Sequence, residues 1–206
     1  MKQLALILFV FSTFCSAQNF TLPESGKKKA LSKAKAESIM YTKKGFVTKD
    51  GSDMKENILD FYNEVYLVDE KKVPKYVWGM GTAKKATEKE AYDKAYQDAI
   101  DNMPGLMITY FQMWTMASKA SDDDRNKVQM AIGDASKAIT QACNAVDYTV
   151  MTYLVNEAKG KFQVHVRTLT NQSALKELAR KEIMKELKKT TDWNEEKMIE
   201  LLTFEK

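Results

Sequence analysis

The sequence has few of the residues that build covalent or metal-linked frameworks. Its 206 residues include two cysteines, one histidine, eight glycines and three prolines. Two cysteines exclude a disulfide scaffold, and one histidine leaves little for a zinc site or a catalytic triad. Glycine and proline are too scarce for a fibrous or low-complexity chain. The chain is 44% hydrophobic and 29% charged, and its length is enough for one domain with a real core.

The first 17 residues have the pattern of a secretory signal peptide. A positive start precedes an unbroken apolar run at residues 4–11, and small residues follow at Cys15 and Ala17. The run is too short to span a bilayer, so the pattern predicts cleavage after Ala17 and export to the periplasm, the outer membrane or the cell surface. The alternative is lipidation of Cys15, and the bulky Phe14 argues against it. Cleavage would leave Cys143 as the lone thiol, which we expect to be buried as a small apolar residue.

Residues 18–52 are predicted to form a basic N-terminal arm. Between residues 27 and 49 the sequence has eight lysines and one acid, Glu37. Such a run is typical of a solvated, half-ordered leader, which is the expectation here, although plain charge would also let it bind anionic lipid headgroups or polyanions. It contains no arginine for bidentate phosphate recognition, and nucleic acid is not an expected partner of an exported chain. The candidates for surface interaction are Lys27, Lys28, Lys29, Lys43 and Lys44.

The pattern over residues 53–189 predicts an α+β domain. A helix begins at Asp53, and a short strand follows at residues 76–83. Thr87 and Glu90 have the spacing of a capping box, which opens an amphipathic helix. Small residues recur once per turn in this helix, and such a smooth stripe lets a helix lie close to a sheet or to another helix. These residues are Ala91, Ala95 and Ala99.

The second half of this domain changes from helical to strand periodicity. Pro104 kinks the preceding helix or begins a new one because it lacks an amide hydrogen, and Ser121 caps the next helix. Alternating apolar residues at 147–156 and 161–170 then predict a β-hairpin. The chain ends with amphipathic helices at residues 173–189 and in the C-terminal segment 190–206.

These elements predict a small antiparallel sheet made of residues 76–83 and the two hairpin strands. We expect the helices that begin at Thr87 and Ser121 to cover one face of this sheet. The basic arm and the C-terminal helical segment would flank it.

The order of these elements is similar to a known arrangement. Trp78, Gly79, Gly81 and Ala83 lie in the first strand, the alanine stripe follows, and the strand at 162–167 comes later. This pattern resembles the LPP-twenty family of small bacterial cell-envelope lipoproteins and, in the same arrangement, the N-terminal domain of flagellar assembly protein T. The resemblance covers residues 76–170. It implies an envelope-associated α+β module and brings no catalytic residues.

The motifs that suggest chemistry are all incomplete. Gly79 and Gly81 lack the third glycine of a dinucleotide fingerprint, because position 84 is Lys84. His165 is expected on the polar face of its strand, in contact with solvent. The acids at the start of the helix after Ser121 lack the spacing of a calcium loop; they are Asp122, Asp123 and Asp124. We therefore predict no enzyme and no catalytic, cofactor-binding or metal-binding residue.

Methionine and aromatic residues gather at residues 103–116, with Met107 and Trp114 as further interaction candidates. A helix that is apolar on all sides is expected to be buried in the core. If it is exposed, a groove for an apolar partner becomes the better interpretation. The leading hypothesis is a non-enzymatic, exported envelope protein that acts by protein or surface interaction, with envelope proteins or a membrane surface as partners. The alternative is a periplasmic protein that binds a small ligand or Cu(I) through this segment.

Overall fold

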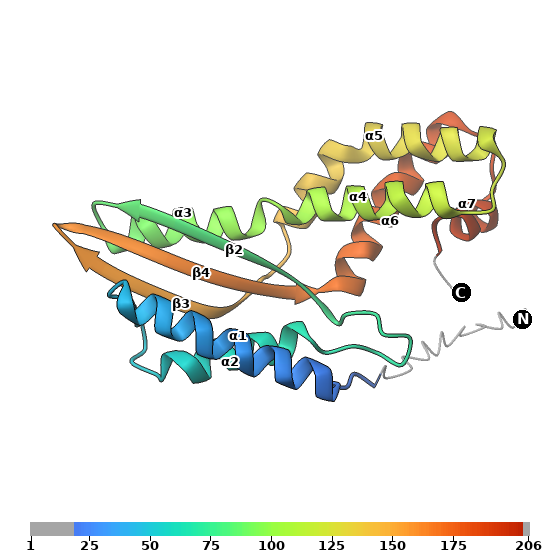
Figure 1. Cartoon of the computed structure of the whole chain (residues 1–206). Coiled ribbons are helices and arrows are strands. Elements are labelled where there is room, and N and C mark those ends of the chain that lie inside the picture. Colours follow the sequence, from blue (N-terminus) through green and yellow to red (C-terminus); the bar gives the residue numbers. More distant parts are fainter. Residues whose placement is uncertain (1–18, 204–206) are drawn as a thin grey trace, which may run out of the picture.

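The computed structural model describes residues 19–203. The predicted signal peptide at residues 1–17, including Cys15, lies outside the described residues. The fold is α+β, as predicted: seven helices, α1–α7, accompany an antiparallel sheet with the strand order β1-β3-β4-β2 among the described residues (Figure 1). Over residues 19–203, no helix combines the length and the apolar character needed to cross a membrane.

The elements follow one another with short connections. The helices are α1 (Glu24–Lys43), α2 (Met54–Val65), α3 (Glu88–Ile100), α4 (Met103–Ala117), α5 (Asp122–Asn144), α6 (Gln172–Thr190) and α7 (Glu195–Leu202). The strands are β1 (Val47–Thr48), β2 (Tyr76–Lys85), β3 (Thr149–Ala158) and β4 (Lys161–Asn171).

Local sequence signals set most of the helix ends. The Thr87 side chain accepts a hydrogen bond from the Glu90 amide, and the Glu90 carboxylate accepts one from the Thr87 amide, so the predicted capping box at α3 is confirmed. Ser121 caps α5 in the expected way. Pro104 lies in the first turn of α4, where no intrahelical amide is needed, so it begins a new helix.

Helix α3 lies unusually close to strand β2 because two glycines face it. A Cβ atom on Gly79 would lie 1.7 Å from the Ala99 carbonyl oxygen, and one on Gly81 would lie 1.9 Å from the Ala95 carbonyl oxygen. Ala95 and Ala99 are fully buried at this contact. The predicted close approach of the alanine stripe to the sheet is therefore confirmed.

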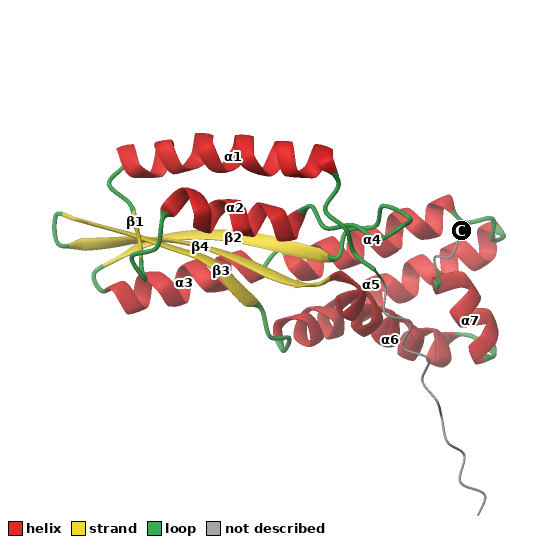
Figure 2. Cartoon of the chain, turned by 90° about the horizontal axis from the view of Figure 1, so that it is seen from below, coloured by secondary structure: helices red, strands yellow, loops and turns green. Residues whose placement is uncertain are grey.

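The other face of the sheet is covered by α1 and α2 (Figure 2). The expectation of a solvated leader before residue 52 is wrong for α1, which buries Ala30, Ala34 and Tyr41 against α2 and the sheet. The reason is a stripe of small residues one turn apart, starting at Gly26, which lets α1 pack closely while its lysines stay outside. The sheet is thus covered on both faces, not on one.

Helices α4 to α7 form a second core beyond one end of the sheet, to the right in Figure 1. The prediction that the helix after Ser121 covers the sheet is wrong, because α5 packs mainly against α6 and α4. Strand β4 ends at Asn171 and α6 begins at Gln172, so the chain passes from the sheet directly into this bundle. The buried residues of α5 are Val128, Ala131, Ile132, Ala135, Ile139 and Cys143.

Candidate functional site

A cluster of buried polar side chains lies between α1 and the sheet. Arg167 of β4 is fully buried, and its guanidinium forms an ion pair with Glu37 of α1. The Glu37 carboxylate also accepts a hydrogen bond from the Tyr62 hydroxyl at 2.6 Å. Burial, and next this hydrogen bond, raise the pKa of Tyr62 above its ordinary value. Three aromatic rings surround the guanidinium, with centroids 5.1–5.7 Å from its carbon; they belong to Tyr41, Phe61 and Tyr62. The cluster joins α1 and α2 to the central strand.

His165 belongs to the same cluster, and its predicted contact with solvent is wrong. The Tyr41 hydroxyl lies 2.9 Å from Nε2, and the Thr82 hydroxyl lies 2.8 Å from Nδ1. Arg167 Nε donates to Nε2 at 3.3 Å, and because this Nε–H can only donate, the contact favours the tautomer with its proton on Nδ1. Burial and, next, the Arg167 charge lower the pKa of His165 to about 3. His165 is therefore a neutral, buried member of a structural network, because helices cover both faces of its strand.

The lone thiol of the described residues is also enclosed. Cys143 is fully buried in the helical bundle, as predicted, and burial raises the pKa of its thiol to about 11. A thiol with so high a pKa is protonated at neutral pH and is a poor nucleophile. Within residues 19–203, no three His, Cys, Asp or Glu side chains gather in a way that would hold a metal ion.

One face of helix α4 is exposed, although the sequence predicted burial on all sides. Met103, Met107 and Phe111 are buried in the bundle core, as expected. Leu106, Met113 and Met116 are instead 48%, 67% and 74% exposed, and their spacing of seven and three residues places them on one face of the helix. The prediction of a helix buried all round is wrong because α4 packs against the other bundle helices on one side only.

These three residues are named here the α4 surface. Helix α4 contains no Asp, Glu, Lys or Arg in its 15 residues, so the face it turns to solvent carries no charge. Three large apolar side chains exposed on one helix face are a candidate contact surface, whereas single exposed apolar residues are ordinary. The sequence predicted burial of Leu106, Met113 and Met116 and offered a partner groove only if their helix is exposed. The absence of charge along the helix was the one signal that could have indicated this exposure.

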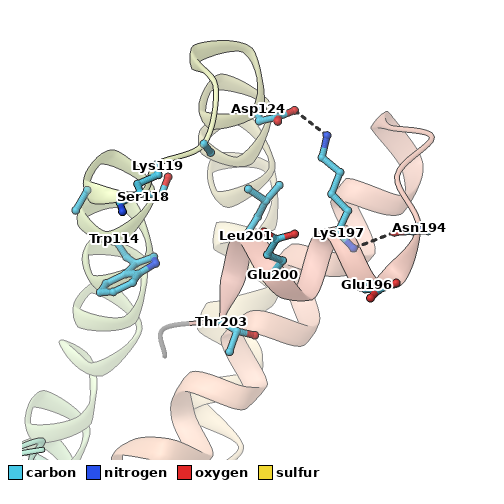
Figure 3. A pocket seen from close by; sticks show the side chains of 12 residues that line it. Trp114, Ser118, Lys119, Asp124, Asn194, Glu196, Lys197, Glu200, Leu201 and Thr203 are labelled. Atoms are coloured by element: carbon cyan, nitrogen blue, oxygen red, sulfur yellow. Dashed lines mark hydrogen bonds and ion pairs between the residues drawn. The ribbon is translucent and has the colours of Figure 1, made fainter. Parts of the chain in front are cut away.

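A cavity of about 680 Å³ adjoins the C-terminal end of α4, between α4 and α7 (Figure 3). Trp114, Ala117 and Leu201 contribute apolar wall. Charged side chains of both signs also line it, namely Lys119, Asp124, Glu196, Lys197 and Glu200. The volume is in the range of small-molecule sites.

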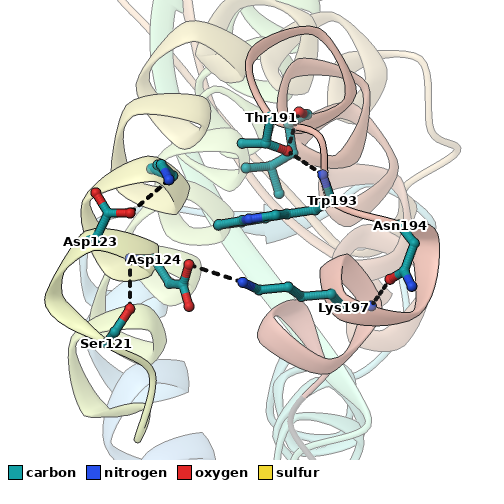
Figure 4. Close-up of polar contacts among 9 residues, drawn as sticks. Ser121, Asp123, Asp124, Thr191, Trp193, Asn194 and Lys197 are labelled. Carbon is teal, nitrogen blue, oxygen red and sulfur yellow. Dashed lines mark hydrogen bonds and ion pairs between the residues drawn. The ribbon is translucent and has the colours of Figure 1, made fainter.

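Polar contacts fix α7, which forms one wall of this cavity, against the start of α5 (Figure 4). The Lys197 ammonium lies 3.2 Å from an Asp124 carboxylate oxygen and 4.5 Å from the centroid of the Trp193 ring. Asn194 caps α7 by accepting a hydrogen bond from the Lys197 amide at 2.9 Å. These contacts hold the α7 wall of the cavity against α5.

The structure separates the interaction candidates predicted from the sequence into two regions. Lys27, Lys28, Lys29, Lys43 and Lys44 are all exposed along α1. Met107 and Trp114 lie on α4, in the helical bundle. Met107 is buried in the bundle core and does not reach the surface, so it is wrong as a contact residue. Trp114 is partly exposed and lines the cavity.

Comparison with known proteins adds no functional assignment: no family model, no curated protein and no solved structure matches this chain. The resemblance to the LPP-twenty family stays a prediction.

Proposed function

We propose that this protein is a non-enzymatic interaction module that binds an apolar segment of a partner protein through the α4 surface. The observation that carries this proposal is the charge-free face of α4, where Leu106, Met113 and Met116 are exposed beside a cavity. Methionine side chains are flexible and polarizable, so such a surface adapts to the shape of an apolar partner. The partner segment would bury these three side chains and contact the cavity rim.

The state of the two most reactive side chains supports a role without catalysis. His165 is neutral and enclosed, and the Cys143 thiol is buried with a raised pKa. Neither side chain is placed to act on a bound substrate, since a general base or nucleophile must reach the reacting atom. The proposal of an export route rests separately on the sequence pattern of residues 1–17. Envelope proteins are then the expected partners.

The cavity favours a second candidate, a protein that binds a small ligand between α4 and α7. Its mixed lining of apolar and charged side chains suits a compact molecule that carries both an apolar part and charge. The Cu(I) version is less favoured, because Met103 and Met107 are buried in the bundle core and leave Met113 and Met116 as the exposed thioethers of α4.

Site-specific photo-crosslinking in the cells that naturally produce this protein tests whether the α4 surface binds a partner protein. A benzoylphenylalanine at position 113 is expected to give one discrete adduct with a partner protein, and Leu106→Gln with Met116→Gln in the same chain is expected to abolish it. Position 80 is the matched control, since Met80 is a half-exposed methionine of β2. No adduct at position 113, or the same adducts from positions 113 and 80, would contradict the proposal.

A further inference from the structure

Helix α1 is the outermost element on its side of the molecule (Figure 2). Its 20 residues make a rod of about 30 Å. Gly26, Ala30, Ala34 and Tyr41 face inward. The opposite stripe, spaced by three and then four residues, consists of Lys28, Leu31, Lys35, Ile39 and Lys43, and it is named here the lysine face.

The positive charge of the lysine face is not neutralised within the protein. Glu37, the one acid between residues 27 and 43, turns inward to Arg167. Over the part of the chain that the structure describes, Lys28, Lys35 and Lys43 form no ion pair. Lys27 is paired with Glu24 at 3.8 Å, at the first turn only. A row of uncompensated cations attracts a surface with many negative charges.

Two large apolar side chains lie in the same row as these lysines. Leu31 and Ile39 are each about half exposed, two turns apart on α1. A helix that carries lysines and large apolar side chains on its exposed side suits the boundary between lipid headgroups and acyl chains, where the apolar groups insert and the ammonium groups meet phosphates. The sugar-phosphate backbone of a nucleic acid provides no apolar surface that would bury Leu31 and Ile39.

We propose that the lysine face of α1 binds the surface of an anionic lipid bilayer. Lys28, Lys35 and Lys43 contact the lipid phosphates, and Leu31 and Ile39 insert between the headgroups. This binding is separate from the α4 surface, so either proposal can fail without the other.

Vesicle sedimentation with the whole chain tests this assignment. Vesicles of phosphatidylcholine with 30 mol% phosphatidylglycerol are compared with pure phosphatidylcholine vesicles, which measure any contribution of the apolar run at residues 4–11. We expect at least about thirtyfold stronger partition to the anionic vesicles, which corresponds to two of the three lysines in contact, and a loss of this excess at high salt.

Charge reversal on α1 has a matched control in the bundle. Lys28→Glu with Lys35→Glu is expected to weaken the anionic binding by at least about 30-fold. Lys137→Glu with Lys181→Glu makes the same change of charge at exposed positions of α5 and α6 and should stay within about threefold of the parent protein. Equal binding to both vesicle types, or equal losses in the two variants, would overturn the proposal.

The apolar insertion separates lipid from other polyanions. Leu31→Gln with Ile39→Gln is expected to weaken vesicle binding about tenfold, since two partly inserted side chains are lost. If this variant binds vesicles like the parent protein and a single-stranded DNA oligonucleotide binds the parent equally tightly, the face is a general polyanion surface and the lipid assignment is wrong. Circular dichroism of each variant checks that α1 remains folded.

Discussion

The sheet with α1–α3 and the bundle of α4–α7 are held together by different kinds of contact. The sheet half combines a backbone contact between β2 and α3 with a charged cluster around Arg167. The helical bundle packs aliphatic and aromatic side chains without a buried ion pair among its described residues, and its exposed α4 surface is free of charge. The sheet half is therefore expected to be sensitive to changes at its backbone contact and at its buried charge, whereas the bundle is held mainly by apolar packing between helices. Three experiments test this contrast.

Alanine at a glycine position gives the largest expected difference between the halves. In Gly81→Ala, the new Cβ would clash with the Ala95 carbonyl oxygen and the Ala99 amide nitrogen, at 1.9 and 2.7 Å. Since both are backbone atoms, α3 must move off the sheet, and we expect a loss of more than about 4 kcal/mol in the free energy of unfolding. Urea unfolding followed by circular dichroism measures this loss.

The matched control is Gly133→Ala in helix α5 of the bundle. A Cβ at Gly133 meets no atom within 4 Å, and alanine favours the helix, so we expect a gain of about 0.5–1 kcal/mol. Similar stability changes in the two variants would show that the close contact of α3 with β2 does not govern the sheet half.

Removal of an ion-pair partner gives the next largest difference. Glu37→Ala leaves the buried Arg167 guanidinium without its carboxylate, and we expect a loss of about 3–5 kcal/mol in the free energy of unfolding. Glu182→Ala in α6 removes a pair with the exposed Lys185, which is worth about 0–1 kcal/mol. Denaturant titration of both variants provides the comparison, and equal losses would refute a special role of the Arg167 cluster.

Acid sensitivity is the smallest expected effect. The pKa of His165 is about 3 in the folded protein, below its ordinary value of 6.5. Well above pH 6.5 the imidazole is unprotonated in both the folded and the unfolded state. Below it the unfolded chain takes up a proton that the folded protein does not, so stability falls by about 1.4 kcal/mol per pH unit, or about 2 kcal/mol between pH 6.5 and 5.

His165→Gln lacks the titrating group and should lose about 2 kcal/mol less stability over this range. Unfolding at pH 6.5 and pH 5 tests the difference between the two proteins. Parallel pH profiles would mean that folding does not lower the pKa of His165.

Local patterns were sufficient for the α+β class, the caps at Thr87 and Ser121, and the contact of Ala95 and Ala99 with the sheet. They failed where the answer depends on a neighbour distant in sequence. The inward stripe of α1 is made of glycine and alanine, which carry little hydrophobic signal beside a run of lysines. The alternation along β4 places His165 on the correct face of the strand, but that face is covered by α1, more than 100 residues away in the sequence.

The same reasoning explains the candidate site. The apolar sequence of α4 predicts that the helix is buried. How much of its surface is covered depends on how the other bundle helices are arranged. Leu106 and Met113 therefore remain exposed although Met107 is buried.

The direct passage from β4 into α6 has a geometric consequence for the two proposed surfaces. The side chain of Asn171 accepts a hydrogen bond from the Ala174 amide at 3.0 Å, so the last residue of the strand is also the cap of the helix. No loop separates the sheet that carries α1 from the bundle that carries α4. When α1 lies on a bilayer, the α4 surface would therefore stand at a fixed distance from the bilayer and in a fixed orientation to it.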